Sequence, residues 1–417
     1  MSTPVGRSIL IYACAFAVAG ATPFLLLPVL TKHLSPEQFG EATAFLMLVT
    51  ILGNIAGLSS HGFVSVRFFK VPVAEFKGIA SSSVAAIGVS HLLTLLAVAA
   101  FYPLLRHAFG LPMPLALLAV GTAFVLNLNL IGLAIFQSSG QPLLYLRARL
   151  AQGVLEFSLC LTLLFHFVPD ASARAYSYSF AIAASATLGL VHCVRHGLLS
   201  ARVRKPDLRA LAAFGVPMLP HVVAGSAVVY LDRLVVSSVL GTEGLGLYMV
   251  AMQFGMAMVA LIEPLNKALA PWLLGQLAKN DTAVRRTIVK RTYQLYGALA
   301  LAGVLVAGVS HLFFDELIGA RFGAARELVP WMVGGFVLQG MYYSVVNYLF
   351  YAERTGRLSA VSATTAALGC VVSYALTSSY GLVGAAVSFA FNNGVLFLLV
   401  WLVASKAVPM PWSLGRA

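Results

Sequence analysis

The sequence predicts an all-α membrane protein that crosses the bilayer about twelve times. Its residues are 60% hydrophobic and only 10% charged, whereas charged residues make up about 25% of a soluble domain. Many apolar runs reach about 20 residues, the length that a helix needs to cross the hydrocarbon core. These runs do not alternate with period two, as barrel strands do. Helices are therefore expected, because a backbone in lipid must satisfy its own hydrogen bonds.

The apolar runs divide into twelve predicted spans. The first begins after Arg7 and stays apolar to Leu30, longer than the apolar core of a secretory signal peptide, so we expect a retained helix. The predicted spans are 9–31, 41–61, 79–104, 115–137, 150–168, 176–199, 211–240, 245–274, 293–314, 329–351, 359–379 and 381–403.

The spans predict two halves of six helices each. Six crossings return the chain to its starting side, so the halves would be parallel repeats. We expect an N-terminal six-helix bundle at 1–199, a cytoplasmic basic linker at 200–210 and a C-terminal six-helix bundle at 211–417. A short internal similarity supports the repeat. Segments 34–40 (LSPEQFG) and 240–246 (LGTEGLG) share Leu first, Glu fourth and Gly last.

The distribution of Lys and Arg predicts the orientation. With the N-terminus inside, 20 of the 27 fall on inner segments or the adjoining span ends, and five fall on outer segments. The outer five are Lys32, Arg106, Arg174, Arg321 and Arg326. Because cytoplasmic loops carry the excess of positive charge, both termini are expected in the cytoplasm. The net charge of +13 is then mainly a topology signal and does not indicate a nucleic-acid surface.

Several functional classes find no support in the sequence. No phosphate-binding loop of the Gly-x-x-x-x-Gly-Lys-Ser/Thr type occurs, so a nucleotide-driven motor is not expected. The four cysteines lie singly in apolar runs without metal-ligand spacing. The longest outer connection, 315–328, is short for an external catalytic loop. We therefore predict no catalytic residues, no metal site and no bound cofactor.

Five ionisable residues inside the spans are the first candidates for function, because such residues usually face a polar cavity or one another. They are Glu156, Asp232, Arg233, Glu263 and Lys267. Glu263 and Lys267 are four residues apart and share one helix face, with Glu on the favourable N-terminal side. They either form part of a cavity wall or make a static ion pair.

Arg233 and Glu156 each have two possible interpretations. Arg233 either faces the cavity or extends to the outer interface. Glu156 has no oppositely charged neighbour in its span. It either exchanges protons as a carboxyl in apolar surroundings or makes a cross-helix hydrogen bond. His221 follows two prolines and is a candidate for the cavity wall. We assign Glu156, Asp232, Glu263 and His221 to an ion-coupling or polar network.

Tyr343, Asn347 and Tyr351 lie four residues apart in the predicted tenth span and therefore share a stripe. Aromatic faces and an amide suit sugar rings, although Tyr is also enriched at membrane interfaces. Together with Arg233 and Lys267 they form the predicted substrate-binding set.

Three segments carry a resemblance to a known family. Segment 28–40 (PVLTKHLSPEQFG) resembles the first-span signature of Wzx-type oligosaccharide flippases. Segment 214–220 (FGVPMLP) is similar to the start of their second half. Asp232-Arg233 followed by 245–248 (LGLY) is similar to the turn between their seventh and eighth spans. The similarity extends over nearly the whole chain, in the superfamily that also holds MATE multidrug exporters and lipid II flippases.

The resemblance implies a transporter, not an enzyme. Such a flippase moves undecaprenyl-diphosphate-linked oligosaccharides, for example O-antigen repeat units, from the inner to the outer leaflet of the bacterial inner membrane. Alternating access of two bundles, driven by a proton or sodium gradient, is implied. The implied partners are the lipid-linked oligosaccharide, membrane lipids, a polysaccharide polymerase and other export proteins, with no nucleic acid. Of the candidate residues, only Asp232 and Arg233 lie in a matched motif, and Arg233 is the expected diphosphate ligand.

Two alternatives stay open at this point. The first is a small-molecule cation antiporter of the same superfamily, which would line its cavity with acids, whereas a diphosphate requires Arg or Lys. The second is a membrane glycan polymerase or ligase, which would require a sizeable outer loop with catalytic groups. Three acids and two bases in the spans do not separate the first alternative from the flippase.

Overall fold

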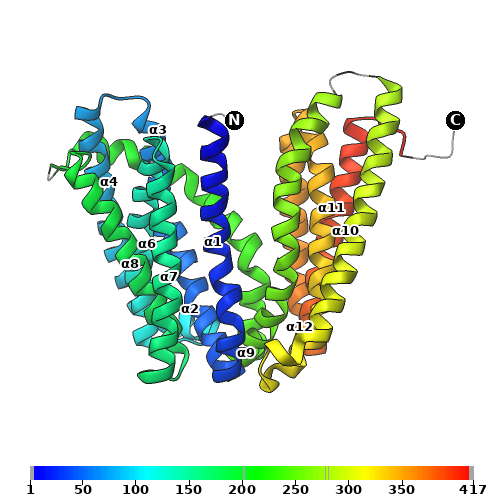
Figure 1. Cartoon of the computed structure of the whole chain (residues 1–417), viewed down its shortest axis with the longest axis horizontal. Coiled ribbons are helices and arrows are strands. Elements are labelled where there is room, and N and C mark those ends of the chain that lie inside the picture. The colour runs from blue at the N-terminus through cyan, green and yellow to red at the C-terminus, as the bar shows by residue number, and fades with distance from the viewer. Residues whose placement is uncertain (1–3, 201, 278, 280, 413–417) are drawn as a thin grey trace. The chain divides into compact units, whose positions relative to one another are not determined.

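The computed structural model describes residues 4–200, 202–277, 279 and 281–412, and within these ranges the regular structure is entirely helical (Figure 1). The elements of the first half of the chain are α1 (Pro4–His33), α2 (Pro36–Ala56), α3 (Ser60–Phe68), α4 (Val73–Ala100), α5 (Tyr102–Phe109), α6 (Met113–Ser138), α7 (Pro142–His166) and α8 (Ala171–Arg195). The remaining elements are α9 (Lys205–Leu277), α10 (Thr282–Leu317), the 3-10 helix η1 (Ala320–Leu328), α11 (Val329–Tyr351) and α12 (Thr355–Ala407).

The predicted fold class, an all-α polytopic membrane protein, is confirmed. Nine helical stretches of the described chain are long and apolar enough to cross a membrane. Most predicted spans fall on one helix or on part of one, and the tenth has the bounds of α11, whereas spans 41–61 and 79–104 run past the ends of α2 and α4 into α3 and α5. The long helices α9 and α12 each contain two predicted spans. Leu92 and Leu96 on α4 and Leu312 on α10 are examples of large apolar side chains that stay exposed, as expected for surfaces that face lipid.

Two glycines interrupt the long helices. Gly241 in α9 has φ 71° and ψ −172°, and Gly381 in α12 has φ 60° and ψ −137°. Side chains make this backbone region costly, so glycine is the residue that adopts it readily. Each is followed three residues later by a second glycine without room for a Cβ. A Cβ on Gly244 would lie 2.4 Å from the Cβ of Leu240, and one on Gly384 would lie 1.9 Å from a backbone oxygen. A Gly-x-x-Gly pair thus marks both breaks between predicted spans.

The chain forms two compact units, Met1–Leu234 and Val235–Ala417, with the boundary inside α9. The first part of α9 packs on the first unit. Leu211 is buried there with Phe63 and Ile79, and Gly215 approaches Leu58 so closely that a Cβ would lie 2.3 Å from the Leu58 carbonyl oxygen. The predicted boundaries at 199 and 211 describe the sequence repeat and stay a prediction.

Two serines near the start of α4 hold the linker. The backbone N–H of Ser200 donates to Ser81 Oγ at 2.8 Å, and that of Arg204 donates to Ser82 Oγ at 3.0 Å. The Arg204 guanidinium then donates to both carboxylate oxygens of Asp207, at 2.7 and 2.9 Å. The described linker residues are therefore docked on the first unit. Ala201 lies outside the described residues.

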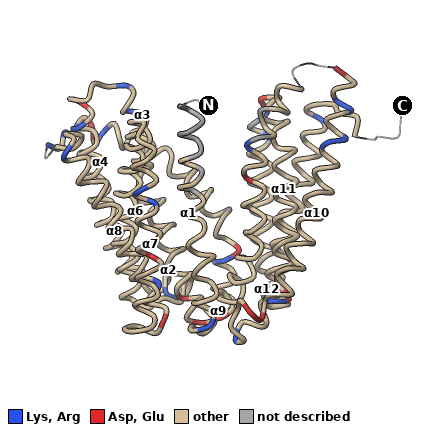
Figure 2. Tube along the Cα trace, in the orientation of Figure 1, with Lys and Arg blue, Asp and Glu red and all other residues tan. Residues whose placement is uncertain are grey.

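Charged residues are unevenly distributed along each unit (Figure 2). In Met1–Leu234, Lys and Arg gather at the end where α4 begins. In Val235–Ala417, many lie towards the end where α10 begins. These are the ends that the sequence assigns to the cytoplasm, and the direction of each unit in the membrane stays a prediction. Arg416, one of the 20 residues assigned to inner segments, lies outside the described residues.

Candidate functional site

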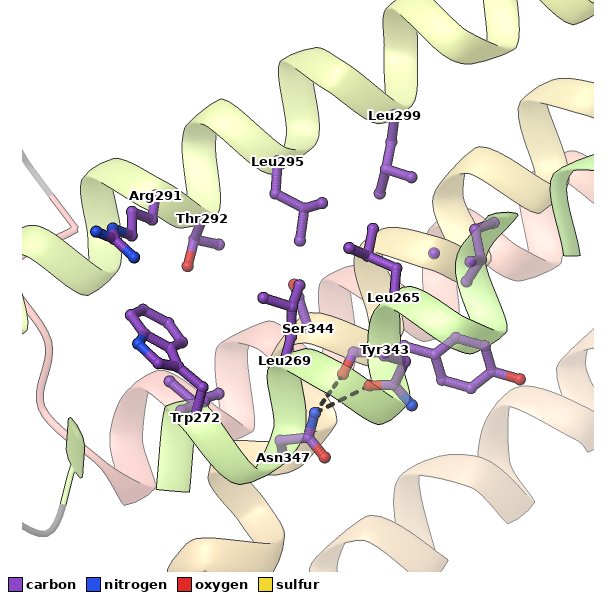
Figure 3. A pocket seen from close by; sticks show the side chains of 14 residues that line it. Leu265, Leu269, Trp272, Arg291, Thr292, Leu295, Leu299, Tyr343, Ser344 and Asn347 are labelled. Carbon is purple, nitrogen blue, oxygen red and sulfur yellow. Dashed lines mark hydrogen bonds between the residues drawn. The ribbon is translucent and has the colours of Figure 1, made fainter. Parts of the chain in front are cut away.

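The second unit contains a pocket of about 440 Å³ between α9, α10 and α11 (Figure 3). Its volume falls in the range of about 300–1,000 Å³ that is common for ligand sites. Seven apolar positions form much of the wall, namely Ile262, Leu265, Leu269, Leu273, Leu295, Leu299 and Gly340. The remaining positions are polar or aromatic, namely Asn266, Trp272, Arg291, Thr292, Tyr343, Ser344 and Asn347. An apolar wall with a few polar groups is the usual composition of a site that binds an organic ligand.

Two carboxamides form the polar centre of this pocket. Asn347 Nδ2 on α11 donates to Asn266 Oδ1 on α9 at 3.2 Å and to the Tyr343 carbonyl oxygen at 2.9 Å (Figure 3). These bonds use both N–H groups of Asn347. Within the described chain, Asn266 Nδ2 and Asn347 Oδ1 make no further hydrogen bond with protein. The pocket therefore offers one amide donor and one amide acceptor on adjacent side chains.

Arg291 on α10 supplies the charge of the pocket. Its guanidinium carbon lies 5.2 Å from the centre of the Trp272 ring, a cation–π contact that orients the side chain. As far as the chain is described, Arg291 has no carboxylate partner and is the one charged residue among those that line the pocket. Glu263 lies near enough to act electrostatically on Tyr343. A guanidinium without a protein anion at a pocket wall is suited to bind an anionic ligand.

The structure brings together part of the predicted substrate-binding set. Tyr343 and Asn347 line the pocket, whereas Tyr351, at the exposed end of α11, and Lys267 do not. Lys267 Nζ lies 3.7 Å from Glu263 Oε2, so the expected pair forms. The Lys267 and Glu263 side chains are 74% and 37% exposed. A pair this exposed contributes little to stability. The functional roles of these residues stay predictions.

Sequence reasoning missed Asn266, Trp272, Arg291 and Ser344. Arg291 was placed in a cytoplasmic segment because the predicted span began at residue 293, whereas α10 begins at Thr282. Asn266 follows Glu263 by three residues and therefore continues its polar helix face, which is a signal that could have found it. Nothing local connects Asn266 with Asn347, because they lie 81 residues apart on separate helices.

Glu156 has an oppositely charged partner on the neighbouring helix, which its own span did not reveal. Glu156 on α7 forms a buried ion pair with Arg174 on α8, and only 5% of each residue is exposed. Arg174 was counted with the outer segments because the sixth span was predicted to begin at residue 176, but α8 begins at Ala171. Glu156 also lies deeper than expected, since α7 begins at Pro142. The cross-helix interaction, the second of the two interpretations, is the one observed.

Asp232 and Arg233 make local contacts within α9. Arg233 Nη1 donates to the Val229 carbonyl oxygen at 2.6 Å, and its guanidinium lies 5.3 Å from the centre of the Tyr230 ring. The Arg233 backbone N–H donates to Asp232 Oδ1 at 2.8 Å. Both side chains are half-buried, and His221 is exposed on the same helix. These residues belong to the first unit, and their assignment to substrate or ion coupling stays a prediction.

A family model described as "Polysaccharide biosynthesis protein" matches residues 5–275, more than half of the chain. The chain belongs to this family. The match includes all of the first unit from residue 5 and the α9 wall of the pocket, up to Trp272 and Leu273.

Relatives of this chain include an uncharacterized membrane protein of Haemophilus influenzae, 24% identical over 84% of each chain. Among solved structures, the lipid II flippase MurJ in an inward closed conformation is similar, with a TM-score of 0.75, 13% identity and coverage of 95% of this chain and 87% of MurJ. An inward-facing multidrug resistance MATE family transporter gives a TM-score of 0.65, 14% identity and coverage of 98% and 95%. The resemblance to Wzx-type flippases and their superfamily is thus confirmed at the level of family and fold.

Proposed function

We propose that this protein is a flippase for undecaprenyl-diphosphate-linked oligosaccharide repeat units such as those of O-antigen. The observation that carries the proposal is the pocket of the second unit. In the described chain its single charged lining residue is a cation, and it stands beside amide and hydroxyl groups on an apolar wall. Family membership supports a role in polysaccharide synthesis, and the fold it shares with transporters supports movement across the membrane.

The pocket chemistry favours a glycan phosphate over a cationic drug. A guanidinium fork can give two hydrogen bonds to phosphate oxygens, whereas it would repel a cation. Asn266, Ser344 and Asn347 supply the hydrogen-bonding groups that sugar hydroxyls and amides require. A cation antiporter would place a carboxylate on the wall, and among the described lining residues there is none.

The location of Arg291 agrees with this role. Arg291 lies nine residues after Thr282 on α10, roughly 13 Å along the helix. With the proposed cytoplasmic termini, this depth is near the inner headgroup layer, where the diphosphate of a newly made unit resides. The glycan and diphosphate enter the protein from the inner leaflet of the bacterial inner membrane while the polyprenyl chain stays in lipid. Alternating access, driven by a proton or sodium gradient and without a bound cofactor, releases the lipid-linked oligosaccharide to the outer leaflet.

Loss of the protein tests the proposal. In a strain that lacks the chain, lipid-linked repeat units should accumulate, and a membrane-impermeant glycosidase added to spheroplasts should not digest them. Re-expression should restore both digestion and surface glycan. Digestible but unpolymerised units in the deletion strain would contradict the flippase and favour the polymerase or ligase. Normal surface glycan together with loss of resistance to cationic drugs would favour the antiporter.

A further inference from the structure

Arg326 ties the 3-10 helix η1 to the end of α10. Its Nη1 donates to Asp315 Oδ2 at 2.9 Å, and its Nη2 donates to the His311 carbonyl oxygen at 2.8 Å. Its Nε donates to His311 Nδ1 at 3.2 Å. His311 and Asp315 are four residues apart on α10 and therefore share one helix face. All three guanidinium nitrogens of one η1 residue thus donate to the same turn of α10.

The hydrogen bond between Arg326 and the His311 ring requires a neutral imidazole. A guanidinium has donors and no acceptor, so Arg326 Nε–H must be the donor. His311 Nδ1 can accept only when it carries no proton, whereas a protonated imidazole has a donor on both nitrogens. Protonation of His311 therefore removes this bond and places two positive charges side by side. The imidazolium then also competes with Arg326 for the Asp315 carboxylate.

The neighbouring elements add few ionisable groups. Phe254 on α9 packs against the same end of α10, and residues 244–262 of α9 include no charged residue and no histidine. The sequence of α11 has none either, and that of α12 has none between its first and last turns. The further charged residues on this end of α10 and on η1 are all exposed, namely Glu316, Arg321 and Glu327. Histidine changes its charge between about pH 5 and 8, so His311 is the group here that responds in this range.

The helix η1 connects two walls of the pocket, because it joins α10 to α11. Phe314 on α10 and Phe322 and Leu328 on η1 are at most 1% exposed, so apolar packing seats η1 from below. The contacts of Arg326 add a polar connection to α10 beside this packing. Loss of that connection frees η1 at the end of α10 farthest from Thr282, which is the outer end in the proposed orientation.

We infer that Arg326, His311 and Asp315 form a pH-sensitive clamp that holds η1 on α10 while His311 is neutral and loosens when His311 is protonated. The inference rests on the proposed function for its direction. With cytoplasmic termini, the clamp faces the periplasm, which is the acidic side of a proton gradient. Acid on that side therefore favours the loosened clamp and an open outer end of the second unit, where the substrate leaves.

Hydrogen–deuterium exchange of the purified full-length protein in phosphatidylcholine nanodiscs tests the clamp. The backbone amides of Ala320–Leu328 are compared at about pH 5.5 and about pH 7.5, after correction for the intrinsic pH dependence of amide exchange. In the wild-type protein they should exchange roughly fivefold faster at the lower pH, the effect of losing one hydrogen bond. Equal corrected rates at the two pH values would overturn the inference, and this comparison needs no variant to fold.

Variants assign the effect to the residues of the clamp. His311→Asn keeps an acceptor on the γ carbon but does not titrate, so η1 should exchange slowly at both pH values. Arg326→Met removes the donors, so η1 should exchange fast at both. His107→Asn changes another exposed histidine, on α5 outside the clamp, and should keep the wild-type pH dependence. A pH effect of full size in His311→Asn would overturn the assignment to His311.

The exchange experiment is independent of the cellular glycosidase experiment described above, because it uses the purified protein without substrate. Failed flipping in the deletion strain together with pH-independent exchange of η1 would refute this inference only. Normal flipping in the deletion strain together with pH-dependent exchange that His311→Asn abolishes would refute the proposed function only.

Discussion

The two units differ in whether their intramembrane polar groups are paired with other protein groups or line a cavity. In Met1–Leu234, two of the buried polar contacts join groups of neighbouring helices inside the packing. Glu156 pairs with Arg174, and Asn127 Nδ2 donates to the Gly53 carbonyl oxygen at 3.0 Å. In Val235–Ala417, Arg291 and the Asn266–Asn347 pair line a cavity and retain binding capacity. Buried polar groups that are satisfied internally specify structure, whereas those that face a cavity are available to a ligand.

The largest expected effect comes from opening the closed network of the first unit. Arg174→Ala leaves the Glu156 carboxylate buried without its partner, which should lower the free energy of unfolding by about 3–5 kcal/mol. The double variant Glu156→Leu with Arg174→Met should recover much of this loss, because no buried charge remains. Thermal unfolding of the purified protein in detergent measures both. A single variant as stable as the wild type would show that the pair is not needed for packing, and the comparison between the units would fail.

A second comparison concerns the two similar segments 34–40 and 240–246. In the first, Ser35 caps α2 by accepting from the Gln38 N–H at 3.2 Å, and Gln38 Oε1 accepts from the Ser35 N–H at 3.0 Å. In the second, Gly241 makes the break with a positive φ of 71°. The repeat in sequence therefore uses a side-chain cap in one unit and backbone freedom in the other.

Alanine substitutions should show how much the glycine break and the serine cap each contribute to stability. Gly241→Ala should cost about 1–3 kcal/mol of stability from backbone strain, even though a Cβ there has nothing within 4 Å. Ser35→Ala should cost about 1 kcal/mol, the usual contribution of a cap. Unfolding midpoints of the two variants, compared with the wild type, measure this order. A neutral Gly241→Ala would mean that the break does not depend on glycine.

The smallest effect is expected at the exposed pair of the second unit. Lys267→Ala should change the stability by no more than about 1 kcal/mol, because the Glu263–Lys267 pair is largely exposed. It is a matched control for Arg174→Ala, since each removes the cation of one ion pair. A loss as large as that of Arg174→Ala would show that exposure does not explain the difference between the pairs.

Most of the fold was predictable because it follows from local composition. The long apolar runs defined the helices, and the predicted tenth span has the bounds of α11. Predicted helix ends were less accurate where polar residues continue a helix. Arg174 and Arg291 were both left outside spans that in fact contain them. Hydropathy cannot assign such residues, because their charge is accommodated by a partner or a cavity that only the folded chain creates.

The candidate site was predictable only in part for the same reason. Tyr343 and Asn347 share a helix stripe, which sequence periodicity reveals. The contact between Asn347 and Asn266 joins two helices, and that between Arg291 and Trp272 joins α10 to α9. Pairings between helices depend on packing, which a single sequence does not display.

Substrate protection of the pocket tests the central claim most directly. Ser344→Cys places a thiol in the pocket wall, in a variant whose four native cysteines are replaced. Ser379→Cys places one on the exposed surface of α12 as a control. We predict that lipid-linked oligosaccharide slows the thiol labelling of Ser344→Cys and leaves that of Ser379→Cys unchanged. Equal labelling rates of Ser344→Cys with and without saturating substrate would contradict the account that the second unit holds the substrate site.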